Sequence, residues 1–358
     1  MLLVVNAGSS SIKWAVFDLD LVEVVAGSVT EIGGHGRLRL GVLDRPCAVA
    51  DHRAALALAL AALADQGFGV ARLTAAAHRV VHGGRDLVQA CRVTPAVIAA
   101  VKNCIPLAPL HNPANLTAIQ ALAELIPDLP QFVSFDTAFH ATNPLVAVTY
   151  ALPAAARDEG LRRYGFHGIS YAGLVRKVQE MAGYTLPSRV LALHLGNGAS
   201  LCAILNGASV ATTMGYSPLD GITMGTRAGG IDGNAVLRLA EVHGIAGAAR
   251  ILNRESGLLG LGGHSDMRAL QAADTPEAAF AVQHFTYWVV RHAGSMIAAM
   301  GGLDAIAFTG GIGQNDAGLR NAILNGLAWA GPVPCYVVPA AEERSIAEQA
   351  LALLLAGA

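Results

Sequence analysis

Apolar residues along the chain gather in short runs that are separated by glycine, serine and aspartate. Three such runs open the sequence, at residues 2–6, 12–17 and 22–29, and the polar segment from Asp18 to Asp20 separates the second run from the third. Short runs rich in β-branched residues and bounded by turn residues are typical of β-strands. We therefore expect the chain to begin with an antiparallel meander.

The first of these turns recurs in the second half of the chain. Residues 3–17 and residues 191–205 both consist of an apolar strand, a polar turn and a second apolar strand, and they lie 188 positions apart. The turns are Gly8–Ser11 and Gly196–Gly198. Backbone N–H groups of such turns can point into one concavity that suits a phosphate group, although a plain hairpin turn is the alternative for either copy alone. The repeat predicts two similar domains and phosphoryl-transfer chemistry.

Helix signals alternate with further strand signals. Proline at the first position of a helix loses no needed hydrogen bond, so helices are expected to start near Asn112 and Thr275. Ser170 is expected to cap another. The predicted helices are 53–64, 112–126, 170–182, 275–300 and 342–355, and the predicted strands include 75–81, 132–135 and 305–308. This alternation favours an α/β fold.

Composition narrows the class of protein. A chain of 358 residues, 53% hydrophobic and 14% charged, has enough apolar residues for two cores. With a net charge of −2, the chain does not have the excess of basic residues that nucleic-acid binding requires. The longest apolar run, Ala54 to Ala64, is too short for a membrane span, and the N-terminus does not have the pattern of a signal peptide, so we expect a cytoplasmic protein. The five cysteines contain no Cys-x-x-Cys pair and predict neither a disulfide framework nor a zinc site.

Two arginines stand where backbone can approach a ligand. Arg79 lies between His78 and His82 at the end of a predicted strand, and Arg227 lies in a glycine-rich loop. A guanidinium group suits two-point contact with carboxylate or phosphate oxygens. A surface ion pair is the alternative for Arg79.

Asp136 and His167 are the other candidates for chemistry. Asp136 directly follows the predicted strand 132–135, a common place for functional carboxylates in α/β sheets, but it could also cap the next turn. His167 lies in the short segment from Tyr164 to Gly168 and could instead be a turn histidine bonded to backbone. Neither motif decides the function alone.

Together, these motifs resemble the acetate kinase family, the acetate and propionate kinases. Eight segments carry the resemblance, in the order 6–13, 78–84, 135–140, 164–168, 194–200, 223–227, 265–268 and 309–313, so it extends over almost the whole chain. It implies the duplicated ribonuclease H-like (actin-like ATPase) fold of sugar kinases, actin and heat-shock chaperones, with a nucleotide cleft between the domains. The implied domains are residues 1–140 with a returning segment 341–358, and residues 141–340.

The resemblance also implies a reaction. It is the reversible, Mg²⁺-dependent transfer of the γ-phosphoryl group from ATP to acetate, which gives acetyl phosphate and ADP by direct in-line transfer. Mn²⁺ is expected to be able to substitute for Mg²⁺, and ATP and ADP act as co-substrates. The partners implied are acetate, ATP and a second copy of the chain in a homodimer, without nucleic acid or membrane.

Site residues are carried over from the family motif by motif. The implied catalytic residues are Arg79, Asp136, His167 and Arg227, and the implied acyl pocket is formed by Val81, Leu110, Phe166 and Pro218. Asn6 and Glu342 are implied at the metal. The implied nucleotide-binding residues are Lys13, His194, Leu195, Gly196, Asn197, Gly198, Asp266, Met267, Arg268, Gly311, Ile312, Gly313, Gln314 and Asn315. Because acetate has no proton to remove at pH 7, we expect Asp136 to orient Arg79 or a Mg²⁺-bound water rather than to act as a general base.

The chain departs from the family pattern near its end. Gln314 stands where the family has Glu, Ala340 and Ala341 replace a Thr-Asn pair, and the segment between Gly313 and Glu342 is shorter than usual. Two other functions remain open. One is a propionate or butyrate kinase of the same fold, and the other is a non-catalytic, nucleotide-driven binding protein like actin or the chaperones. The second class would not need Arg79, Arg227 and His167 together.

Overall fold

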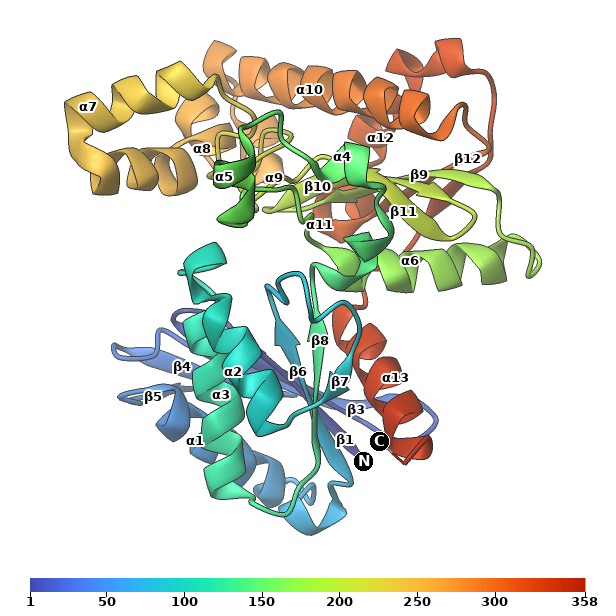
Figure 1. Ribbon diagram of the computed structural model, residues 1–358. Helices are drawn as coiled ribbons and strands as arrows, with labels where there is room; N and C mark the ends of the chain where they lie inside the picture. The colour runs from blue at the N-terminus through green and yellow to red at the C-terminus, as the bar shows by residue number, and fades with distance from the viewer. Residues whose placement is uncertain (358) are drawn as a thin grey trace. The chain divides into compact units, whose positions relative to one another are not determined.

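The computed structural model describes residues 1–357 and divides into two compact units (Figure 1). Unit 1 comprises Met1–Phe139 and the C-terminal segment that begins at Ala341, and unit 2 comprises His140–Ala340. None of the helices in the described part of the chain combines the length and the apolar character that a membrane span requires.

Unit 1 is built on an eight-stranded sheet with the order β5-β4-β3-β2-β1-β6-β8-β7. The first five strands form an antiparallel meander, whereas β1, β6 and β8 are parallel. The meander was expected, but its extension by β4 and β5 was not, because Gly36–Leu40 is a short segment with two arginines. The bounds are β1 (Leu2–Ala7), β2 (Ser11–Phe17), β3 (Glu23–Thr30), β4 (Gly36–Leu40), β5 (Leu43–Cys47), β6 (Ala75–Val80), β7 (Cys91–Arg92) and β8 (Gln131–Phe135).

Helices cover both faces of this sheet (Figure 1). On one face, α1 (His52–Asp65) and α3 (Asn112–Leu125) pack on each other and on the sheet, and α2 (Pro95–Asn103) packs on α3. On the other face, α13 (Glu342–Leu355) packs against β1, β6 and β8. The expected helix starts at Asn112 and Glu342 are confirmed.

Unit 2 contains a five-stranded sheet with the order β11-β10-β9-β12-β13. Its strands are β9 (Arg189–Leu195), β10 (Ala199–Leu205), β11 (Ala208–Thr212), β12 (Ala305–Thr309) and β13 (Cys335–Val337). The first three in chain order are antiparallel neighbours, and β9, β12 and β13 are parallel. Strands β3-β2-β1-β6-β8 of unit 1 have the same order and directions. The repeat seen in the sequence is thus a repeat of topology.

The register of the two repeated hairpins differs by one residue. Ala7 pairs with Ile12 across the first turn, whereas Leu195 pairs with Ala199 across the second, so the second turn is one residue shorter. The spacing of 188 residues therefore holds before the turn and becomes 187 after it. As a result, the pair Asn6 and Lys13 in unit 1 is equivalent to the pair His194 and Ser200 in unit 2.

Helices also cover both faces of the unit 2 sheet (Figure 1). The long helix α10 packs on β9, β10 and β11, and α6 packs on β9 and β12. The bounds are α4 (Leu145–Val148), α5 (Ala154–Asp158), α6 (Gly168–Met181), α7 (Gly233–Arg250), α8 (Gly257–Gly262), α9 (Met267–Ala272), α10 (Pro276–Met300), α11 (Gly310–Asn315) and α12 (Ala317–Gly326).

The expected cap of α6 is wrong. The helix begins at Gly168, and its N-cap is His167 in the left-handed region, with φ 58°. The side chain of Ser170 instead makes a hydrogen bond of 2.8 Å with His194 Nδ1 on β9. A long-range polar contact therefore takes the hydroxyl group that the sequence pattern assigned to local capping.

Candidate active site

Arg79 and Asp136 form the centre of a polar cluster in unit 1. Arg79 is near the end of β6, and Asp136 directly follows the neighbouring parallel strand β8, so both lie at one edge of the sheet. The guanidinium donates from Nε to Asp136 Oδ1 at 3.0 Å and from Nη2 to Oδ2 at 2.5 Å. The carboxylate is 2% exposed and the pair is held at two points, which fixes the orientation of the guanidinium plane.

Two further predicted residues reach the same guanidinium. Arg79 Nη1 donates to Asn6 Oδ1 at 3.3 Å, and Glu342 Oε2 lies 4.0 Å from Nε. Asn6 is on β1, and Glu342 is the first residue of α13. Three predicted site residues, from β1, α13 and the end of β8, thus gather around the guanidinium of Arg79 on β6.

Negative charge exceeds positive charge in this cluster. Burial raises the pKa of Glu342; the nearby charge of Arg79 lowers it, but those of Asp136 and Glu343 raise it further. Burial lowers the pKa of Arg79, but the charges of Asp136 and Glu342 outweigh this effect and raise it above its ordinary value. The excess of hard oxygen donors suits a divalent cation such as Mg²⁺, which binds a few carboxylates and keeps water or phosphate ligands. Among residues 1–357, no group of three His, Cys, Asp or Glu side chains is placed to hold a metal by itself.

Other predicted residues of unit 1 are placed less centrally. Lys13 is exposed on β2, directly opposite Asn6. Val81 is buried, whereas Leu110 is 49% exposed. The backbone N–H of Val81 donates to Asn115 Oδ1 at 3.1 Å.

Two buried asparagines of α3 were missed by sequence reasoning. Asn115 bridges Val81 N and the carbonyl oxygen of Ala7, and Asn112 makes a double hydrogen bond with the backbone of His82. These amides therefore fix the chain that follows Arg79 and the start of the first turn. Amide side chains on the apolar face of a predicted helix were the available signal.

In unit 2, His167 lies between the second turn and α6. Its Nδ1 is 2.9 Å from Ser200 Oγ, and its ring stacks on His194 with centroids 4.1 Å apart. The preceding carbonyl, that of Phe166, accepts a hydrogen bond of 2.8 Å from His140 Nε2. The left-handed backbone of His167 is thus fixed from both sides, as is common at functional positions.

Gly198 of the second turn is the point where His167 and Arg227 meet. A Cβ atom placed on Gly198 would lie 3.3 Å from His167 Nε2 and 3.7 Å from Arg227 Nη1. Arg227 Nη1 also donates to the carbonyl oxygen of Pro218 at 3.2 Å. Two predicted catalytic side chains therefore converge on one glycine, and one of them also contacts the predicted pocket residue Pro218. Phe166, which directly precedes His167, is 1% exposed and lies in the core.

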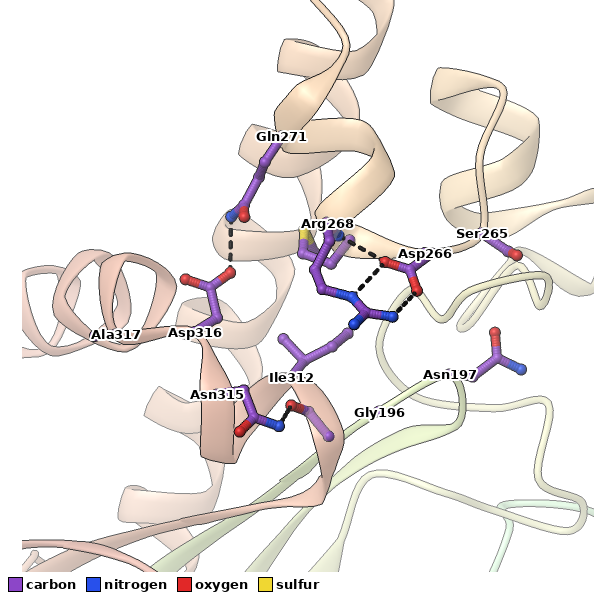
Figure 2. Close-up of a pocket in the computed structure, with 12 residues that line it drawn as sticks. Gly196, Asn197, Ser265, Asp266, Arg268, Gln271, Ile312, Asn315, Asp316 and Ala317 are labelled. Carbon is purple, nitrogen blue, oxygen red and sulfur yellow. Dashed lines mark hydrogen bonds and ion pairs between the residues drawn. The ribbon is translucent and has the colours of Figure 1, made fainter. Parts of the chain in front are cut away.

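A cavity of about 670 Å³ adjoins this turn, and Figure 2 shows the residues that line it. Eight predicted nucleotide-binding residues line it: Gly196, Asn197, Asp266, Met267, Arg268, Gly311, Ile312 and Asn315. Ser265, Gln271, Asp316 and Ala317 also line it and were not predicted. Five predicted nucleotide-binding residues of unit 2 are absent from its lining: His194, Leu195, Gly198, Gly313 and Gln314. Lys13 belongs to unit 1 and does not line it either.

Polar pairs shape this cavity (Figure 2). Arg268 Nη2 donates to Asp266 Oδ2 at 2.8 Å, and the Arg268 hydrogen bonds lower the pKa of Asp266 to about 2. Gln271 Nε2 donates to Asp316 Oδ2 at 2.7 Å, which joins α9 to the start of α12. A cavity lined by residues of two glycine-rich segments, one arginine and three amide side chains can hold a polyphosphate or a nucleoside.

Gln314 and Ala340, two residues that differ from the family pattern, are in contact. Gln314 Oε1 accepts a hydrogen bond from the backbone N–H of Ala340 at 3.3 Å. The amide therefore ties α11 to the segment that leads into α13. This contact belongs to the short route between Gly313 and Glu342.

Comparisons with known proteins show which proteins this chain resembles. A model of the acetokinase family matches residues 1–346. An acetate kinase of Nitrobacter hamburgensis is 42% identical over 392 aligned positions, which include 99% of this chain and 96% of that protein. The crystal structure of Porphyromonas gingivalis acetate kinase is similar with a TM-score of 0.93 and 34% identity, and covers 99% of each chain. A propionate kinase from Francisella tularensis has the same TM-score of 0.93 at 31% identity, over 97% of this chain and 98% of that one. The expected α/β fold with duplicated domains is confirmed.

Proposed function

The chain belongs to the acetokinase family, and we propose that it phosphorylates acetate with ATP through Arg79, Asp136, His167 and Arg227. The products are acetyl phosphate and ADP. The observation that carries this assignment of residues is the convergence of His167 Nε2 and Arg227 Nη1 at Gly198, next to a cavity large enough for a nucleotide.

The chemistry explains why these residue types are needed. A transferring phosphoryl group spreads negative charge over its equatorial oxygens, and the acceptor acetate is itself an anion. Arg227 and His167 supply hydrogen-bond donors where this charge develops, and Arg79 neutralises the acetate carboxylate.

Asp136 acts as an orienting residue in this proposal. Its two-point pair with Arg79 holds the guanidinium in one plane, and acetate offers no proton for a general base. The buried carboxylate would be costly without its partner, so the pair is a unit in which each side chain fixes the other.

Mg²⁺ fits the cluster of unit 1. Asn6 and Glu342 offer one amide and one carboxylate oxygen, beside Asp136, in a site where negative charge is in excess. When bound, Mg²⁺ neutralises phosphate charge and orients the phosphate oxygens. Mn²⁺ accepts the same oxygen ligands and is proposed as a substitute.

The nucleotide is proposed to occupy the cavity beside the second turn. Gly196, Asn197, Gly311 and Ile312 line it together with Asp266 and Arg268. Glycine turns suit phosphate groups, and the wider part of the cavity suits the nucleoside. Since the reaction consumes ATP, we propose the cytoplasm as its location.

Propionate is the second candidate substrate. The predicted acyl pocket is apolar, and a similar solved structure is described as a propionate kinase. One extra methylene group changes discrimination in an apolar pocket by only ~1–3 kcal/mol. Acetate is therefore proposed as the preferred acid, with propionate as a slower substrate.

A homodimer through α10 is also proposed. This helix carries an aromatic stripe at four-residue spacing, Phe280, His284, Trp288 and His292, and the neighbouring Tyr287 is 61% exposed. Exposed aromatic groups of this kind favour protein–protein contact. Light scattering of the purified protein should give twice the chain mass, and Phe280→Glu with Tyr287→Glu should give a monomer; a wild-type monomer would contradict the proposal.

The reaction itself can be tested with a hydroxylamine trap. Purified protein with acetate, ATP, Mg²⁺ and hydroxylamine should form acetohydroxamate, and omission of acetate serves as the control. Arg227→Ala should abolish the signal while still binding ATP. If wild-type protein bound ATP but formed no hydroxamate, the binding-protein alternative would be favoured.

A further inference from the structure

His167 is connected to two buried hydroxyl groups that lie behind it in unit 2. Its Nδ1 is 2.9 Å from Ser200 Oγ on β10. The phenol oxygen of Tyr171, on α6, is 2.7 Å from the same Oγ and 2.8 Å from the carbonyl oxygen of Ser200. Ser200 and Tyr171 are fully buried, so water does not compete for these contacts.

When each proton is given to a single acceptor, the three contacts indicate where the protons lie. The carbonyl oxygen of Ser200 only accepts, so the single phenol proton of Tyr171 points to it. The contact between the two hydroxyl groups then needs the Ser200 proton, which points to the Tyr171 oxygen. The remaining contact needs a proton on His167 Nδ1 that is donated to Ser200 Oγ. One arrangement of hydrogens satisfies all three contacts.

The phenol proton is retained over the working pH range. Burial raises the pKa of Tyr171 well above its ordinary value, an effect that exceeds the opposing hydrogen bonds from Ser200 and His194. The chain of donors therefore keeps its direction at neutral and moderately alkaline pH.

We propose that Ser200 and Tyr171 are positioning residues that hold the proton of neutral His167 on Nδ1, so that its Nε2 carries a proton only when the ring is an imidazolium. This inference rests on the proposed function, since it concerns how His167 meets the phosphoryl group. His167 Nε2 is the atom that faces Gly198 and Arg227. A neutral ring would present a lone pair to phosphoryl oxygens, whereas the imidazolium would donate a hydrogen bond to them.

Turnover should therefore require the charged form of His167. The titratable or charged groups around this ring come from three directions. His194 of β9 stacks on it, Arg227 of the glycine-rich loop lies beside Gly198, and Tyr171 of α6 lies beyond Ser200. Behind Tyr171 are Cys202 and His140, whose ring centroid is 5.7 Å from that of Tyr171.

The proton position can be observed without activity. In ¹⁵N-histidine-labelled protein, long-range ¹⁵N–¹H correlation spectra distinguish the two neutral tautomers, and His167→Asn identifies the signal of His167 among the 12 histidines. We expect neutral His167 to carry its proton on Nδ1. Ser200→Ala and Tyr171→Phe should move it to Nε2, because the acceptor for Nδ1–H is lost or the Ser200 hydroxyl is released to donate to Nδ1. A wild-type ring protonated on Nε2 overturns the proposal.

The pH profile of turnover gives the second readout. Wild-type kcat should fall about tenfold per pH unit above the pKa of His167. In Tyr171→Phe and Ser200→Ala this alkaline limb should flatten, because a neutral ring with Nε2–H can still donate, although kcat near neutral pH should be about tenfold lower from weaker positioning. Wild-type and variant profiles of identical shape overturn the proposal.

Thr212→Val is the matched control. Thr212 is a buried hydroxyl of the same sheet that donates to the carbonyl oxygen of Leu201 at 3.0 Å. Its loss should leave the tautomer and the shape of the pH profile unchanged, which separates positioning from a general effect of losing a buried hydroxyl. If wild-type protein formed no acetyl phosphate, the function would fail, while the tautomer spectrum would still decide the role of Ser200 and Tyr171.

Discussion

The guanidinium of Arg79 and the carboxylate of Asp136 meet in parallel, with Nε 3.0 Å from Oδ1 and Nη2 2.5 Å from Oδ2. Each side chain lies at the end of a parallel strand, so the backbone of the sheet sets their spacing. The pair is rigid because both partners are anchored and one of them is buried. The orientation of Arg79 therefore depends on the charge of Asp136.

Replacement of that charge should stop catalysis without unfolding the protein. Asp136→Asn keeps the shape but provides one acceptor in place of two, so Arg79 loses its fixed plane, and kcat should fall about 10²–10³-fold. The hydroxamate assay with parallel thermal unfolding would measure this. Asp44→Asn, which removes an exposed partner of Arg37, is the control. Turnover of Asp136→Asn within a factor of about two of wild type would rule out an orienting role.

Arg227 should not be replaceable by lysine. Arg227→Lys keeps one positive charge but loses the planar guanidinium group, whose Nη1 donates to the Pro218 carbonyl and lies beside Gly198. We expect kcat to fall about 10²-fold in Arg227→Lys and 10³–10⁵-fold in Arg227→Ala. Steady-state kinetics with the exposed Arg250→Lys as control tests this. Equal rates for wild type and Arg227→Lys would mean that charge alone suffices.

The length of the acid should affect kcat/KM in a graded way. Val81 and Phe166 are buried apolar residues of the predicted acyl pocket. Propionate should be used about 10–200-fold less efficiently than acetate, and butyrate less still. Val81→Ala should narrow the gap between acetate and propionate. Equal or better use of propionate by the wild-type protein would make it a propionate kinase.

The ionised carboxylate of Glu342 should lower the stability of the folded protein when no metal cation is bound. Since its folded-state pKa is raised, the stability that it contributes is present at low pH and is lost as the pH rises past its ordinary value of 4.5. Glu342→Gln should therefore unfold about 1–3 °C higher than wild type at pH 8 without Mg²⁺, and this difference should vanish at low pH. Mg²⁺ should stabilise wild type more than the variant. A lower unfolding temperature for the variant at pH 8 would contradict this account.

Buried histidines should make unit 1 sensitive to acid. Burial lowers the pKa of His78 to about 4 from 6.5, so the stability tied to its neutral form is present above pH 6.5 and is lost as the pH falls towards 4. This loss amounts to about 3 kcal/mol of unfolding free energy. His78→Gln should not lose this part of the unfolding free energy as the pH falls. Urea unfolding at several pH values would measure the difference. Parallel curves for wild type and variant would refute the role of His78, since His82 titrates in both proteins.

The sequence predicted those elements that carry strong local signals. Proline and polar starts located α3 and α10 closely, and the opening strands were found because alternating runs and tight turns are local features. The repeated hairpin also followed from residue type alone. By contrast, β4, β5 and α7 have weak patterns and were missed.

What could not be predicted depends on contacts between distant segments. Ser170 bonds His194 rather than its own helix, and Gln271 lines the cavity because α9 packs near the start of α12. The shortening of the second turn by one residue also escaped the sequence comparison, which equated Lys13 with Leu201 instead of Ser200. The nucleotide-binding residues, however, were implied by the family resemblance of the motifs, and the cavity gathers eight of them.

That shortened turn has an evolutionary consequence. At the equivalent position of the two hairpins, the first copy pairs the amide of Asn6 with the cation of Lys13. The second copy pairs the imidazole of His194 with the hydroxyl of Ser200. A single ancestral hairpin would have had only one such pair of side chains at this position. Two copies can change separately, so the same hairpin position carries an amide bonded to Arg79 in one half and an imidazole stacked on His167 in the other.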